Sequence, residues 1–458
     1  MRIAWLLAVA LVACGSVSVT PGMDANGPGP DASMTADAGS TDDAPPPDAA
    51  LPGPVEVTVK KTGVVQQDVE VLFSEADGSA VTRLQTDAAG YTRADLYPGG
   101  IVSIVWTDAE GKHVASFYAL REGDHVVYDM EPHAPVTADV GMVNFDFATA
   151  NKPAGTTDWD IHIGCSHFNI PSSNNTYSTS IDSDCVGSGS KVNVLVKAMN
   201  NTTVVAFGTA MDLNQVTGNW SAPIVWQVGT PANLNLHLDN APLHSVFFTS
   251  EVTLVRNGIR YSLGSKSSPA GVGQSTTVQV PVPAGFAQTT SVSMGVGWDM
   301  TAGPEGFSLY GYNTATAVPD PLTRDLSTTL LPRVNNLTTD RTTMERPAVG
   351  WQSDAALVAD VLMVDLHQEG VIADDTDDRY WKLFLPPDFV PPVQLPVFPA
   401  DVAEYAPDTS ALDEPRLFVI DLSGADGYRA GQILFGTAVE DPSGATAQET
   451  KMQFSGDK

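Results

Sequence analysis

Positive charge is scarce in this sequence. The 458 residues hold 23 Lys and Arg against 54 Asp and Glu, which gives a formal net charge of -31. Such a chain repels nucleic-acid backbones, and no basic patch or nucleic-acid motif opposes that repulsion. Nucleic acid is therefore excluded as a partner. The excess of acid also keeps a protein soluble outside the cell.

Catalytic motifs are also missing. The sequence has no Gly-x-Ser-x-Gly elbow, no His-Glu-x-x-His, no phosphate loop and no dinucleotide fingerprint. With so many carboxylates, any two could be proposed as a hydrolytic pair, so none is singled out. We expect no catalytic residue, no cofactor and no enzymatic activity.

The apolar run near the start of the sequence is too short to span a membrane. Met1-Arg2 precedes an apolar stretch from Ile3 to Ala13, about eleven residues, whereas a membrane-spanning helix needs roughly twenty. One cation, a short hydrophobic stretch and small residues before a cleavage point predict a secretory signal over residues 1–13.

The end of this signal carries a cysteine. Leu11-Val12-Ala13-Cys14 resembles the lipobox of bacterial lipoproteins, which implies diacylglycerol on the Cys14 thiol, cleavage before Cys14 and acylation of the new N-terminus. Stable anchoring takes more than one acyl chain. The alternative is an ordinary secretory signal with an incidental cysteine. Gly15 stands where Asp favours inner-membrane retention in these lipoproteins, so the resemblance points to the outer membrane and leaves open the side that the body faces.

An acidic linker follows the predicted anchor. Residues 16–54 contain Pro45-Pro46-Pro47 but no aromatic residue, Lys or Arg. Such a segment buries too little apolar surface to offset the entropy of ordering, so we expect a disordered stalk over 14–54.

Cysteine is scarce too, with three in the chain. If Cys14 is lipidated, Cys165 and Cys185 remain as an even pair, and an oxidising compartment favours a disulfide between them. The alternative is a metal site, because His162 and His167 flank Cys165. Within a strand, however, His162 and Cys165 would point to opposite faces.

The rest of the sequence is typical of β-strands. Val55-Glu-Val-Thr-Val59 alternates apolar and polar residues, and Asp-Gly and Pro-Gly turns punctuate residues 55–131. Thr86-Asp-Ala-Ala-Gly90-Tyr91 and Leu96-Tyr97-Pro98-Gly99, with Gly63 and Val69-x-Val71, resemble the carboxypeptidase regulatory-like domains. The resemblance implies a transthyretin-like seven-stranded sandwich that serves as an accessory module without catalytic residues.

Two further regions complete the expected fold. Strand-like segments over 136–343 predict one or two sandwiches, and residues 345–458 predict a C-terminal sandwich. The predicted fold is all-β: a disordered lipid-anchored stalk followed by several antiparallel β-sandwich domains.

One acidic cluster suits a cation. Asp374, Asp375, Asp377 and Asp378 lie close together, and calcium prefers several flexible oxygen ligands. The cluster lacks the glycine and distal Glu of an EF-hand loop, and a solvated acidic turn explains it as well.

These features together predict a non-enzymatic, lipid-anchored cell-envelope protein that acts in binding, adhesion or scaffolding. Its partners would be the membrane, through the lipid, and an envelope protein or glycan. One alternative is a carbohydrate-binding lipoprotein, which would present exposed coplanar aromatic rings. The other is an extracytoplasmic hydrolase, which would have a pocket with convergent ionisable groups.

Overall fold

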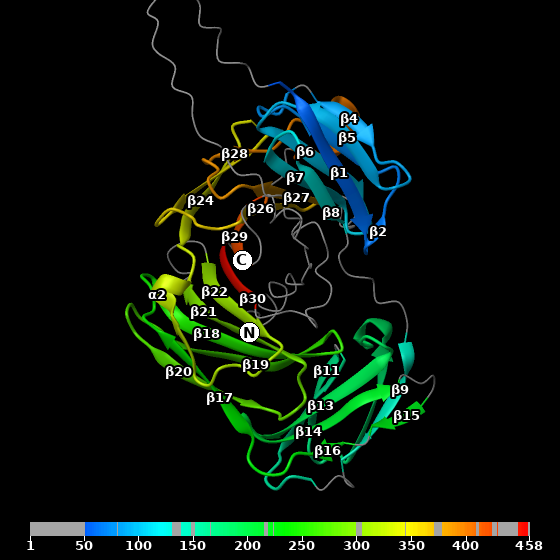
Figure 1. The fold of residues 1–458 in the computed structure, drawn as a ribbon, viewed down its shortest axis with the longest axis vertical. Helices are drawn as coiled ribbons and strands as arrows, with labels where there is room; N and C mark the ends of the chain where they lie inside the picture. The colour runs from blue at the N-terminus through cyan, green and yellow to red at the C-terminus, as the bar shows by residue number, and fades with distance from the viewer. Residues whose placement is uncertain are drawn as a thin grey trace, which may run out of the picture.

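The computed structural model shows an all-β protein built from stacked sheets (Figure 1). It describes residues 51–79, 81–130, 139–147, 152–164, 166–214, 219–222, 224–298, 305–343, 345–370, 378–408, 412–423, 428 and 448–456. Helical structure among them comprises η1 (Ser183–Cys185), α2 (Leu326–Thr329) and η3 (Ala400–Tyr405). No helix in these ranges is long and apolar enough to cross a membrane.

A 12-stranded sheet runs through the molecule and links segments far apart in sequence. Its strands, in spatial order, are β19 (Ile259–Pro269), β18 (Ser245–Arg256), β21 (Thr289–Trp298), β22 (Glu305–Thr314), β30 (Gln448–Gly456), β29 (Arg416–Leu422), β26 (Val361–Gln368), β27 (Arg379–Leu385), β7 (Lys112–Leu120), β6 (Gly100–Thr107), β3 (Glu70–Ser74) and β4 (Thr82–Gln85). The C-terminal strands β29 and β30 lie between the upper and lower parts in Figure 1. The domain limits expected from the sequence stay a prediction, but hydrogen bonds cross them, since β27 pairs with β7 and β30 with β22.

Three smaller sheets pack on this long sheet. They consist of β2 (Val64–Val65), β1 (Gly53–Lys61), β5 (Tyr91–Leu96) and β8 (His125–Asp129); of β20 (Thr276–Val282), β17 (Ala232–Asp239) and β23 (Leu322–Asp325); and of β24 (Val334–Asp340), β25 (Ala348–Ser353) and β28 (Val393–Gln394). Each sheet encloses its own apolar core with the long sheet.

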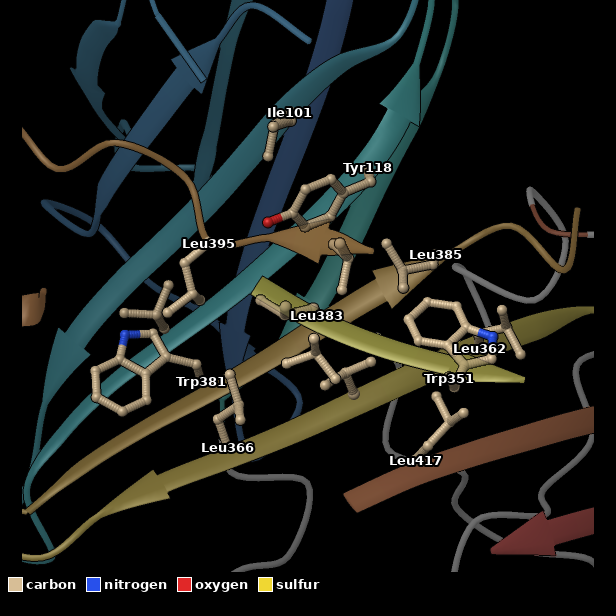
Figure 2. Close-up of a cluster of buried hydrophobic side chains, with 14 of the residues drawn as sticks. Ile101, Tyr118, Trp351, Leu362, Leu366, Trp381, Leu383, Leu385, Leu395 and Leu417 are labelled. Carbon is tan, nitrogen blue, oxygen red and sulfur yellow. The ribbon is translucent and has the colours of Figure 1, made fainter. Parts of the chain in front are cut away.

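Alternation along the strands explains these cores. Val55, Val57 and Val59 on β1 are fully buried and face one way. On β6, by contrast, six consecutive residues are buried, because the β1 sheet covers one face and the β25 sheet the other. Figure 2 shows the second of these cores, where Trp351 and Trp381 lie among leucines from both layers.

A further sandwich occupies residues 139–226, and its Leu195 and Phe207 also join the core beside the β17 sheet. Its two sheets contain β11 (Ser166–Pro171), β10 (Asp158–Ile163), β13 (Lys191–Asn200), β14 (Thr203–Asn214) and β16 (Val225–Trp226), and β12 (Thr176–Asp182), β9 (Asp139–Asp146) and β15 (Asn219–Ala222). Trp159, Ile161 and Ile163 of β10 point into the core between them. The alternate residues Asp160 and His162 therefore lie on the opposite face.

Candidate functional site

The β10–β11 hairpin brings three ligand-type side chains together. Asp160 and His162 are two residues apart on β10, and His167 on β11 is the cross-strand partner of His162. Asp160 Oδ1 lies 3.0 Å from His162 Nε2 and 2.7 Å from His167 Nε2. The two imidazole rings stack with centroids 4.5 Å apart. We call these three residues the hairpin cluster.

A buried lysine holds the other oxygen of the carboxylate. Lys197 is the partner of Asp160 on β13, and its Nζ lies 2.9 Å from Asp160 Oδ2. Only 5 % of the lysine side chain is exposed. Its ammonium also donates to the carbonyl oxygen of Ser262, 3.3 Å away. Asp160 is thus fixed from the β13 side through one oxygen, while its other oxygen faces the histidines.

The electrostatics of the hairpin cluster keep its carboxylate charged. Burial by itself raises the pKa of Asp160, but contacts with His162, His167 and Lys197 outweigh it and hold the pKa well below the usual range. Burial lowers the pKa of His162 to about 4, against the opposing pull of Asp160. His162 is therefore neutral at pH 7 and keeps a lone pair on one ring nitrogen.

A second group of rings crosses four strands of the long sheet. Trp106, His113, Tyr380 and His367 are successive cross-strand partners on β6, β7, β27 and β26. Their rings stack with centroids 5.0, 4.8 and 4.6 Å apart. We call this row the ring ladder. Within it the ring faces pack on each other, so it does not present the exposed coplanar rings expected of a glycan-binding face.

A pocket of about 270 Å³ lies beside the ring ladder. Its lining consists of Trp106, Asp108, Ala109, Glu110, His113, Val114, Met130, Tyr380 and Lys382. These nine residues include no serine, threonine or cysteine that could act as a nucleophile. Burial raises the pKa of Asp108, but a backbone N–H of Glu110 and the imidazole of His113 lower it further than burial raises it. A glycosidase acid needs the opposite shift, so the pocket does not support hydrolysis through Asp108.

The residues predicted from the sequence fall in several places. Cys14 lies outside the described residues, as do Asp374, Asp375 and Asp377. Asp378 is described at the end of the ring ladder, where its Oδ1 accepts a hydrogen bond of 2.7 Å from the N–H of Gly370. That bond, with a contact to His367, holds the pKa of Asp378 below its usual range. Calcium binding stays a prediction.

The structure describes one of the two cysteines of the predicted disulfide. Cys185 is buried in η1, and Cys165 lies outside the described residues. Both neighbours of Cys165 approach Cys185: the hydroxyl of Ser166 lies 3.6 Å from its Sγ. A Cβ on Gly164, whose φ is +52°, would fall 2.0 Å from its carbonyl oxygen. Glycine is therefore required there, and the predicted disulfide stays a prediction.

The sequence analysis did not predict the hairpin cluster, because it grouped His162 and His167 with Cys165 as possible metal ligands and left Asp160 out. The signal was present: period-two alternation puts Asp160 and His162 on one face, and a tight turn at Gly164 pairs His162 with His167. The contribution of Lys197 required the register between β10 and β13, which the sequence does not reveal.

Comparisons with known proteins give no family. No protein-family model matches the chain, and no curated protein matches it. Among solved structures, a streptococcal ancillary pilin matches with 7% identity and a TM-score of 0.16, over 60% of this chain and 98% of the pilin. The Bacillus anthracis TIE protein matches with 10% identity and a TM-score of 0.15, over 53% of this chain and 45% of that one. Likenesses this low carry no argument about fold or function.

Proposed function

We propose that the protein is a non-enzymatic, lipid-anchored component of a bacterial cell envelope, which holds a large all-β body near a membrane for binding, adhesion or scaffolding. The observation that carries this proposal is the apolar run from Ile3 to Ala13 followed directly by Cys14, a sequence that resembles a lipobox. Outer-membrane placement follows from Gly15 in the same resemblance.

The architecture supports this role. A continuous 12-stranded sheet joins several sandwiches into one all-β body. Buried aromatic residues account for much of the aromatic content, including Trp159, Trp298, Trp351 and Trp381. These rings stabilise cores, which favours a structural and binding role over glycan stacking.

Membrane fractionation of a bacterial host tests the proposal. The full chain should sediment with the membranes, and Cys14→Ser should move it to the soluble fraction, because lipidation requires the Cys14 thiol. Ser40→Ala, a change in the predicted linker, is the control and should leave the protein with the membranes. If Cys14→Ser sediments like the unaltered chain, the anchor is wrong.

Two further experiments test the membrane placement and the direction that the body faces. Gly15→Asp should shift the protein toward inner-membrane fractions on a density gradient. Protease treatment of whole cells should degrade the body if it faces outward and spare it if it faces the periplasm.

A further inference from the structure

We propose that Asp160, His162 and His167 bind a divalent transition-metal ion, with zinc as the ion whose ligand preferences they match. Two imidazole nitrogens and one carboxylate oxygen form a common donor set for zinc, with water as the fourth ligand. The proposal concerns the sandwich of residues 139–226 and does not depend on the lipid anchor.

The spacing of the ligand atoms fits one ion. Zinc–nitrogen and zinc–oxygen bonds of about 2.0–2.1 Å in a tetrahedron place ligand atoms roughly 3.3 Å apart. In the hairpin cluster Oδ1 lies 3.0 and 2.7 Å from the two Nε2 atoms, and all three atoms lie within 4.8 Å of one another. A shift of Asp160 Oδ1 away from the two Nε2 atoms by a few tenths of an ångström would bring both distances to that spacing.

The Nε2 atom of His162 supplies a second, independent observation. His162 is 8 % exposed, and its Nε2 is buried without a hydrogen bond of acceptable alignment, although Asp160 Oδ1 is 3.0 Å away. A buried ring nitrogen without a well-aligned hydrogen bond is costly. A metal ion would accept its lone pair, and the neutral ring would then carry its proton on Nδ1.

The scaffold holds the three ligands in place and leaves one side open. All three lie on paired strands of one hairpin, and Lys197 fixes the oxygen of Asp160 that would not bind the ion. Outer partners of this kind orient the ligands of metal sites. The side chain of His167 is 56 % exposed, so an ion and its water can enter from solvent. The positive charge of Lys197 weakens the site relative to one without it.

Calorimetric titration tests the proposal. The full chain in detergent, stripped of metal with EDTA and exchanged into buffer, is titrated with zinc chloride at pH 7.5. We expect one ion per chain. His167→Gln should weaken binding by at least ten-fold, because it removes a ligand on the exposed side without disturbing the core.

Matched variants keep the test decisive. His125→Gln changes an exposed histidine that contacts Thr58, and it should bind zinc like the unaltered chain. Cobalt(II) absorption in the visible range should show a four-coordinate site that His162→Gln abolishes, with circular dichroism confirming the fold. The proposal would be overturned if titration with zinc released no heat. It would also be overturned if His167→Gln and His162→Gln bound zinc as tightly as the unaltered chain does.

Discussion

The hairpin cluster and the ring ladder are both built from histidine rings stacked across β-strands, but their carboxylates are arranged differently. In the hairpin cluster two histidines share one oxygen of Asp160. In the ring ladder Tyr380 separates the histidines: His113 lies 2.9 Å from Asp108, and His367 lies 2.5 Å from Asp413.

This difference determines what each group can do. Ligand atoms that converge on one point can surround an ion, whereas histidines separated by a tyrosine and paired with separate carboxylates form several local contacts. Stacked rings alone thus indicate sheet packing, and convergence of their nitrogens indicates a metal site.

The largest predicted effect separates the two carboxylates. Asp160 and Asp108 are almost equally exposed, at 17% and 18%, but only Asp160 balances a buried lysine. Asp160→Asn should lower the free energy of unfolding by about 3 kcal/mol, because it leaves Lys197 buried without its counter-charge. Asp108→Asn should cost about 1 kcal/mol or less.

Urea denaturation followed by tryptophan fluorescence measures both variants. Equal losses for Asp160→Asn and Asp108→Asn would show that the Lys197 contact adds nothing. The hairpin cluster and the ring ladder would then differ only in how their rings are arranged.

The predicted disulfide between Cys165 and Cys185 should stabilise the sandwich with the hairpin cluster by about 3 kcal/mol. Reduction should therefore speed amide hydrogen exchange in β10 and β11 and leave β6 and β7 unchanged. Thiol titration of the denatured, unreduced chain checks the pairing itself. Two free thiols from this pair would contradict it.

The ring ladder should contribute through its ring contacts. Tyr380→Ala removes two stacked neighbours, His113 and His367, and should lower the free energy of unfolding by about 2 kcal/mol. Tyr380→Phe keeps both ring contacts and loses a hydroxyl contact of 3.4 Å with Asp378. We expect it to unfold within about 0.5 kcal/mol of the unaltered chain; a loss as large as that of Tyr380→Ala would assign the effect to the hydroxyl.

The smallest predicted effect lies at the acidic end of the ring ladder. If Asp374, Asp375, Asp377 and Asp378 bind calcium, millimolar calcium should raise the melting temperature of the full chain by about 2 °C. Asp378→Asn should reduce that rise. Identical melting curves with calcium and with EDTA would contradict calcium binding at this cluster.

Much of the fold could be predicted from local pattern. The all-β class is confirmed, and β1 follows the alternation of Val55, Val57 and Val59. The long sheet could not be predicted, because pairs such as Trp381 with Val114 join residues far apart in sequence. The hairpin cluster could have been predicted, because a short turn sets the pairing of His162 with His167. The contact between Asp160 and Lys197 could not, because it depends on the register between two strands that are distant in sequence.

The mass of the mature N-terminus tests the central claim most directly. The protein is extracted from host membranes in detergent, digested, and its N-terminal peptide analysed by mass spectrometry. We expect a peptide that begins at Cys14 and carries a thioether-linked diacylglycerol and an amide-linked acyl chain. A mature chain that begins elsewhere, or that begins with an unmodified Cys14, would contradict it.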